Sequence, residues 1–327
     1  MGRREIVAGL LGLILLPACG SAAPAATSPS PTTTPSPAPT PQPPRVTFTG
    51  SVARTPGATV RFGPGLDMPV MDIEPAGRSD SFDGWIARPD GAWLHLADGR
   101  GWVAGAAVQG QPPAGMPQTA WNGPAALPDA TAGLLDIAID LQDQRATCEV
   151  AALKMALSGR GILTDERTLL AAAGIDGRAP EVDARGNILR WGDPETAFVG
   201  SPDGSPPEHT GYGVYAPPIA RAATRAGAQV LASGPGIAPA ALYRDVIGGH
   251  PAVAWVTNDY RAGSLATWTA WDGAEVRYSL KEHAVLVIGV TPTQVLLDDP
   301  WYGQRWHARG EFEAAYGTFG DMAVVIA

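Results

Sequence analysis

Short runs of alternating apolar and polar residues fill the stretch from residue 45 to residue 110, and glycine, proline and aspartate separate them. Alternation with a period of two is typical of strands that have one buried face, and the separating residues are typical of turns. The stretch therefore predicts a small all-β barrel over residues 45–110, near the lower size limit for a domain that is stable alone. We expect Trp85, Trp93 and Trp102 to fill or cover its core.

A second domain is predicted over residues 133–327, after a stretch rich in proline, glycine and alanine that is expected to be a linker, residues 111–132. Thr164 is the expected N-cap of the second of its four predicted helices. The predicted helices cover residues 148–157, 165–173, 217–226 and 239–247. The predicted strands cover residues 252–257, 284–290, 294–297 and 322–326. Because helices come first and strands later, the domain is predicted to be α+β.

The N-terminus has the pattern of an export signal. Arg3 and Arg4 precede the uncharged apolar run 6–16, which has the length of a signal-peptide core and is too short to span a bilayer. The run leads to Ala18-Cys19-Gly20, which resembles a bacterial lipobox. Residues 1–18 are therefore predicted to be a lipoprotein signal peptide, with Cys19 as the lipidated residue. The alternative is an ordinary secretory signal that is cleaved elsewhere.

Residues 19–44 consist almost wholly of alanine, proline, serine and threonine. Such a segment cannot bury enough apolar surface to fold, and its prolines favour a semi-stiff, extended tether. Several acyl chains on Cys19 would anchor the chain stably. We therefore expect an exported protein that is lipid-anchored to the outer face of the bacterial cell membrane.

Composition narrows the expected partners. The formal net charge is −9 and no basic run follows the N-terminus, so nucleic acid is not an expected partner. The chain has neither a phosphate-binding glycine motif nor a cluster of cysteines and histidines with metal-ligand spacing. We therefore expect no cofactor and no metal.

Cysteine usage points to Cys148 as a reactive group. The chain has two cysteines, and lipidation of Cys19 would leave Cys148 without a disulfide partner inside the chain. Cys148 begins a predicted helix, where free N–H groups and the helix dipole favour the thiolate. The pattern predicts an activated nucleophile, whereas the alternative is a buried cysteine that serves as a small apolar residue.

One histidine is best placed to be a base. His283 directly precedes a predicted buried strand, and a hairpin after that strand could bring Asp299, or Asp298, beside the imidazole. Upstream of the cysteine, Gln142 or Gln144 could donate a hydrogen bond to an oxyanion. The other histidines lie in the first domain, in loops or near an expected sheet edge: His95, His209, His250 and His307.

Together these residues resemble the papain-like peptidases of the bacteriocin-processing family (peptidase C39-like). The match is closer to the stand-alone branch, which has Cys-Glu, as in Cys148-Glu149, where exporter-linked members have Cys-Gly. Gln142 lies six residues before Cys148 and Asp299 sixteen after His283, and both spacings fit the family. Further matching segments are Trp191-Gly192-Asp193-Pro194, Phe198-Val199-Gly200 and Gly211-Tyr212-Gly213-Val214-Tyr215-Ala216-Pro217.

The resemblance implies a fold and a mechanism. The fold is an α+β papain-like domain, in which N-terminal helices pack on an antiparallel sheet. The expected roles are Cys148 as nucleophile in an ion pair with His283, Asp299 as the residue that orients the imidazole, and Gln142 as the oxyanion donor. The implied activity is hydrolysis of peptide bonds through an acyl-enzyme. The alternatives are a peptidoglycan stem-peptide hydrolase or transpeptidase with the same residues, and a non-catalytic envelope binding module.

The first domain has a resemblance of its own. The segments 60–70 and 93–103 are similar to bacterial SH3-type domains, which usually attach a protein to the cell wall or to a peptide. The expected partners are therefore a peptide or peptidoglycan-peptide substrate and, through Cys19, the membrane.

Overall fold

The computed structural model describes residues 46–327. The expected signal peptide, the lipidation site Cys19 and the tether lie outside the described residues. Between residues 46 and 327, no helix has both the length and the apolar character needed to cross a membrane.

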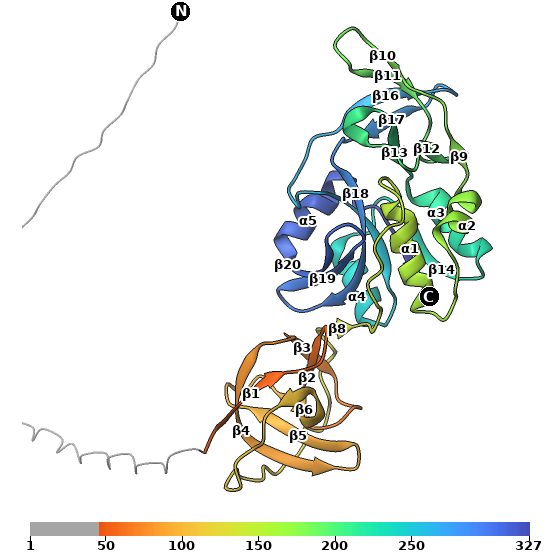
Figure 1. Cartoon of the computed structure of the whole chain (residues 1–327). Coiled ribbons are helices and arrows are strands. Elements are labelled where there is room, and N and C mark those ends of the chain that lie inside the picture. The colour runs from red at the N-terminus through yellow and green to blue at the C-terminus, as the bar shows by residue number, and fades with distance from the viewer. Residues whose placement is uncertain (1–45) are drawn as a thin grey trace, which may run out of the picture. The chain divides into compact units, whose positions relative to one another are not determined.

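The first part of the described chain is an antiparallel sheet of seven strands, in the order β3-β2-β6-β5-β4-β1-β7 (Figure 1). Its core contains the side chains of Val60, Phe82 and Leu96, and Trp93 and Trp102 are buried as predicted. The strands are β1 (Phe48–Val52), β2 (Gly57–Arg61), β3 (Val70–Pro75), β4 (Ser79–Arg88), β5 (Gly91–Leu96), β6 (Trp102–Ala104) and β7 (Val108–Gln109), with a 3-10 turn, η1 (Gly105–Ala107), before the last.

The segment that follows β7 packs back onto this sheet. Met116 is buried in the core of the sheet, and the Trp85 indole N–H donates to its carbonyl oxygen at 3.2 Å. Trp121 makes edge-on ring contacts with Phe62 and Trp102, at centroid distances of 5.8 and 6.1 Å. The first part of the expected linker is therefore in contact with the β unit.

The second part of the described chain is built on a larger antiparallel sheet, in the order β14-β21-β15-β18-β19-β20, with β8 alongside β18. Its strands are β8 (Gly133–Leu134), β14 (Val230–Gly234), β15 (Ala252–Thr257), β18 (Glu282–Val290), β19 (Gln294–Asp299), β20 (Gly303–Ala308) and β21 (Ala323–Ile326). The helices are α1 (Cys148–Ser158), α2 (Glu166–Ala173), α3 (Ala216–Arg225), α4 (Pro239–Ile247) and α5 (Arg309–Thr318). This mixture of sheet and helices confirms the α+β prediction.

Two smaller sheets accompany the larger one (Figure 1). The first has the order β10-β11-β16-β17 and the second the order β13-β12-β9. Their strands are β9 (Ile175–Asp176), β10 (Glu181–Val182), β11 (Ile188–Trp191), β12 (Phe198–Gly200), β13 (Gly211–Gly213), β16 (Ala266–Ala270) and β17 (Glu275–Tyr278), and a short 3-10 turn, η2 (Pro206–Glu208), precedes β13.

Helices cover both faces of the larger sheet, which explains why all nine residues of β18 are buried. Alternate residues of the central strands point to opposite faces. Trp255 and Leu286 belong to the hydrophobic cluster that includes α1, whereas Val285 and Val287 belong to the cluster that includes α4 and α5. The sheet is thus held rigidly from both sides at the point where β18 carries the candidate base.

Two local expectations need correction. The N-cap of α2 is Asp165, not Thr164, because the Asp165 carboxylate accepts the Thr168 backbone N–H at 2.7 Å. The helix α5 was not predicted, although its buried residues Phe312, Ala315 and Tyr316 have helical spacing.

Candidate active site

Cys148 is the first residue of α1, as the sequence predicts. The loop before it is held by the buried carboxylate of Glu166, which accepts the Thr147 hydroxyl at 2.7 Å and the Asp143 backbone N–H at 3.0 Å. α1 itself packs against β18 and β15. These contacts fix the helix start against the strand that carries His283, and the role of Glu166 in them was not foreseen from the sequence.

His283 and Asp299 form a buried pair. The His283 Nε2 and the Asp299 Oδ1 lie 2.9 Å apart. The backbone N–H groups of Trp301 and Tyr302 also donate to Oδ1, and the Tyr260 hydroxyl donates to Oδ2 at 2.7 Å. Burial would raise the pKa of Asp299, but the hydrogen bond and charge of His283 and the other donors lower this pKa to about 2.

The pairing determines which imidazole nitrogen is free. An ionised carboxylate only accepts hydrogen bonds, so Nε2 of His283 carries the proton toward Asp299. The Nδ1 lone pair of the neutral ring is then available as a base.

Asp298, the rival of Asp299 in the sequence, lies elsewhere. Its carboxylate accepts the Gln304 side-chain amide at 2.8 Å, and burial raises its pKa to about 6. The two aspartates are neighbours on β19 and point to opposite faces of the sheet. Of the two, Asp299 is the one in contact with His283.

A cavity of about 260 Å³ connects the candidate residues. Cys148, His283 and Gln142 all line it, and Trp301 and Tyr302 form part of its wall. Of the five histidines in the chain, only His283 lines this cavity. The structure therefore brings together the cysteine, histidine and glutamine that were selected from the sequence.

The two candidate glutamines differ in position. Gln142 lines the cavity, and its amide nitrogen donates to the Gln144 carbonyl oxygen at 2.7 Å. The Gln144 side chain instead donates to Asp203 at 3.1 Å in an exposed contact. Gln142 is thus the one placed to reach a group bound in the cavity.

We expect Gln142→Ala to lower kcat by about 10²-fold while KM stays near its original value, because an oxyanion donor acts mainly in the transition state. Steady-state kinetics on a cleaved peptide would measure both constants. Gln144→Ala is the matched control and should stay within about threefold of the wild type. Equal losses in the two variants would contradict the assignment of Gln142.

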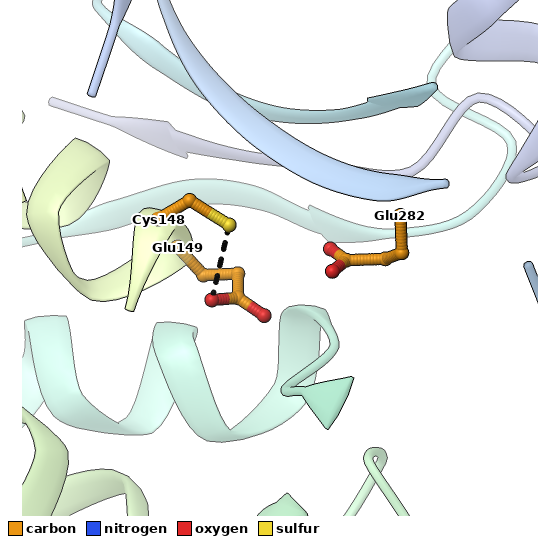
Figure 2. Close-up of side chains that lie close together, drawn as sticks. All are labelled: Cys148, Glu149 and Glu282. Atoms are coloured by element: carbon orange, nitrogen blue, oxygen red, sulfur yellow. Dashed lines mark hydrogen bonds between the residues drawn. The ribbon is translucent and has the colours of Figure 1, made fainter. Parts of the chain in front are cut away.

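The Cys148 thiol has a different environment from the one expected. The sulfur donates to Glu149 Oε2 at 3.5 Å (Figure 2). Among the hydrogen bonds of residues 46–327, none joins this sulfur to His283. Burial first, and then the charges of Glu149 and Glu282, raise the pKa of the thiol well above its ordinary value. The predicted helix position is right. Burial and the two carboxyl groups act on the pKa of the thiol in the opposite direction to the helix terminus.

Glu149 and Glu282 were not recognised in the sequence as site residues, although each is the immediate neighbour of a candidate catalytic residue. Both are buried, with Glu282 7% exposed. Glu149 Oε1 accepts the Val214 backbone N–H at 2.6 Å, whereas Glu282 Oε1 has no hydrogen-bond partner among the described residues. Burial raises the pKa of Glu149 to about 7 and that of Glu282 well above its ordinary value, with the charge of Glu149 adding to the latter.

These two carboxyls predict a pH-dependent stability. A carboxyl group whose pKa is raised by folding stabilises the native state below its unfolded pKa, 4.5, and this contribution is lost as the pH rises through the folded pKa, about 7 for Glu149. Removing one of the two charges should offset part of that loss. We expect Glu282→Gln to be more stable than the wild type at pH 8 and to differ little from it at pH 4, because the pKa of the Glu282 carboxyl is raised by burial.

Urea denaturation at both pH values, with a chelator present, would measure the difference. An equal stability change at pH 4 and pH 8 would contradict this prediction. Glu208→Gln, which changes an exposed carboxylate in the same domain, is the control and should show little change at either pH.

A helix-borne cysteine and a strand-borne histidine–aspartate pair around one cavity are typical of cysteine peptidases, and comparison with known proteins agrees with this class. Residues 135–324, more than half of the chain, match the Peptidase C39-like family. The chain belongs to this family, as the resemblance had implied.

Two relatives can be named. The uncharacterized protein YvpB of Bacillus subtilis is 31% identical over 182 residues, which cover 55% of this chain and 68% of YvpB. A crystal structure assigned to a C39-like peptidase from Bacillus anthracis is 25% identical, with a TM-score of 0.51, and the match covers 60% of this chain and 97% of that chain.

Proposed function

We propose that this protein is a cysteine peptidase that hydrolyses peptide bonds with Cys148 as nucleophile, His283 as base, Asp299 as the orienting residue and Gln142 as the oxyanion donor. The observation that carries the proposal is the 2.9 Å contact between His283 and Asp299 beside a cavity that Cys148 also lines. Membership of the Peptidase C39-like family supports the same reaction class.

The raised pKa of the Cys148 thiol favours proton transfer during attack over a resting ion pair. When a peptide fills the cavity, the sulfur turns from Glu149 toward His283 and passes its proton to Nδ1 as it attacks the carbonyl carbon. Gln142 and the Cys148 backbone N–H then stabilise the oxyanion.

The remaining steps return the enzyme to its starting state. The protonated His283 gives its proton to the leaving amine, and the C–N bond breaks to leave a thioester on Cys148. Water, deprotonated by His283, attacks the thioester and releases the carboxylic acid. The thiol recovers its proton, so the reaction needs no other reactant.

The test uses the full chain with Cys19→Ser, in which Cys148 is the only thiol. We expect this protein to generate new amino termini in a proteome-derived peptide library, identified by mass spectrometry, and an epoxysuccinyl probe to alkylate Cys148. Both results should be lost in Cys148→Ala, and probe labelling should fall strongly in His283→Ala. Labelling that is unchanged in His283→Ala, together with an uncleaved library, would contradict the proposal and favour a binding module.

We also propose that the chain is an exported lipoprotein that is anchored through Cys19, and that its seven-stranded β unit is an SH3-like domain that binds the cell wall or a peptide. The lipobox-like sequence before Cys19 and the length and all-antiparallel order of the β unit support this proposal. Such an anchor would present the site to envelope peptides, including peptidoglycan stem peptides. Expression in a bacterial host with an alkyne-tagged fatty acid should label the wild type and not Cys19→Ala.

A further inference from the structure

We propose that Cys148, Glu149 and Glu282 form a binding site for a divalent metal ion of the zinc type, and that an ion bound there blocks the nucleophile. One ligand atom from each of the three side chains lies within 4.8 Å of the other two. Figure 2 shows the sulfur of Cys148 and the two carboxyl groups converging on one small region, from the start of α1 and from β18. All three residues are buried.

The strongest single observation is the side chain of Glu282. It is 7% exposed, and its Oε1 has no hydrogen-bond partner within residues 46–327. A buried carboxyl oxygen without a donor costs free energy, and a buried carboxylate is normally paired or bound to a metal. The side chain points toward Glu149 and Cys148 (Figure 2), so the missing partner would lie between these groups.

Glu149 is oriented in a way that suits metal binding. Its Oε1 accepts the Val214 backbone N–H at 2.6 Å, and its Oε2 is the oxygen that lies beside the Cys148 sulfur. Metal-binding carboxylates are commonly held by such a hydrogen bond from a neighbouring group. One oxygen therefore holds the side chain in place, while the other faces the Cys148 sulfur, where an ion could bind both.

The donor set selects the kind of ion. A thiolate with two carboxylates suits zinc or cadmium, whereas magnesium and calcium prefer six or more oxygen ligands. Zinc–ligand distances of about 2.0–2.3 Å place tetrahedral ligands roughly 3.5 Å apart, so only small movements would close the present cluster around an ion. A dication would also offset the repulsion between the acidic groups.

The ion has a route to the site, and its effect on the thiol follows from the geometry. Cys148 and Glu282 both line the cavity that His283 lines, so an ion and a fourth ligand, a water molecule, can enter from there. A sulfur whose lone pair is bound to zinc is a weaker nucleophile toward a carbonyl carbon than the free thiolate. The binding site itself does not depend on the proposed function, whereas the loss of peptidase activity on binding does.

The test uses the full chain with Cys19→Ser, titrated with cadmium ions as a spectroscopic substitute for zinc. We expect one ion per chain, seen by the ultraviolet sulfur-to-cadmium charge-transfer band, and we expect zinc to displace it and to protect Cys148 from iodoacetamide. The band should be lost in Cys148→Ser. Glu282→Gln should weaken binding at least about tenfold, while Glu208→Gln, an exposed carboxylate, should leave it unchanged.

Two results would overturn the inference. The first is the absence of a stoichiometric charge-transfer band. The second is a cadmium affinity that is the same in Glu282→Gln as in the parent, which would mean that the thiol alone holds the ion. Thermal melting of each variant checks that it is folded. Because the charge-transfer band does not require turnover, a chain without peptidase activity that binds cadmium would contradict the proposed function only. A chain that cleaves peptides but gives no cadmium band would contradict only the metal site.

Discussion

His283→Ala is expected to lower kcat/KM by about 10³-fold. The Cys148 thiol is buried beside two carboxyl groups that raise its pKa, so it depends on a base to remove its proton during attack. General acid–base catalysis by a positioned imidazole contributes about 10² to 10⁴-fold, and here the same ring serves both half-reactions. Kinetics on a peptide found in the library screen would measure the loss.

The pH profile of the same variant is a second readout. Because the pKa of the thiol is raised, the remaining activity of His283→Ala should increase as the pH rises above neutral, when the thiolate forms without a base. His250→Ala is the matched control, since His250 lies outside the cavity and contacts Arg160 instead. A His283→Ala enzyme with near wild-type kcat/KM at neutral pH would exclude His283 as the base.

Asp299→Ala is expected to lower kcat/KM by about 10²-fold or more, whereas Asp298→Ala should stay within about threefold of the wild type. Asp299 holds the His283 ring and selects its tautomer, whereas the Asp298 carboxylate accepts a hydrogen bond from the Gln304 side chain. Asp299→Asn should recover part of the activity, because the amide oxygen can still accept the Nε2 proton. Recovery by Asn and not by Ala would separate orientation from a general loss of structure.

The two aspartates also predict opposite pH effects on stability. The pKa of Asp299 is lowered from 3.8 to about 2, so its contribution of about 2 kcal/mol is present above pH 4 and is lost as the pH falls through 2. The pKa of Asp298 is raised to about 6, so its contribution is present below pH 4 and is lost as the pH rises through 6. Denaturation of Asp299→Ala and Asp298→Ala between pH 2 and pH 8 would measure how the free energy of unfolding of each variant depends on pH. Parallel curves for the two variants would contradict this prediction.

Sequence patterns located the elements that carry the site, for identifiable reasons. The run of β-branched and other apolar residues after His283 has no polar position to interrupt it, because helices cover both faces of β18. α1 is likewise buried on most sides, although it contains Glu149 and Lys154, and it begins at Cys148. The helix α5 was missed because it has only three buried positions and contains Gly310 and Gly317, and a pattern of that length is ambiguous without the sheet that it covers.

Local sequence alone determined that a cysteine begins a buried helix and that a histidine begins a buried strand, because periodicity and turn residues act over a few neighbouring positions. Only the tertiary structure decided between Asp298 and Asp299, since adjacent strand residues point to opposite faces and the register with β18 selects the one that meets His283. It also determined the direction in which the pKa of Cys148 is shifted, because that pKa depends on burial and on Glu282, which is distant in sequence and close in space.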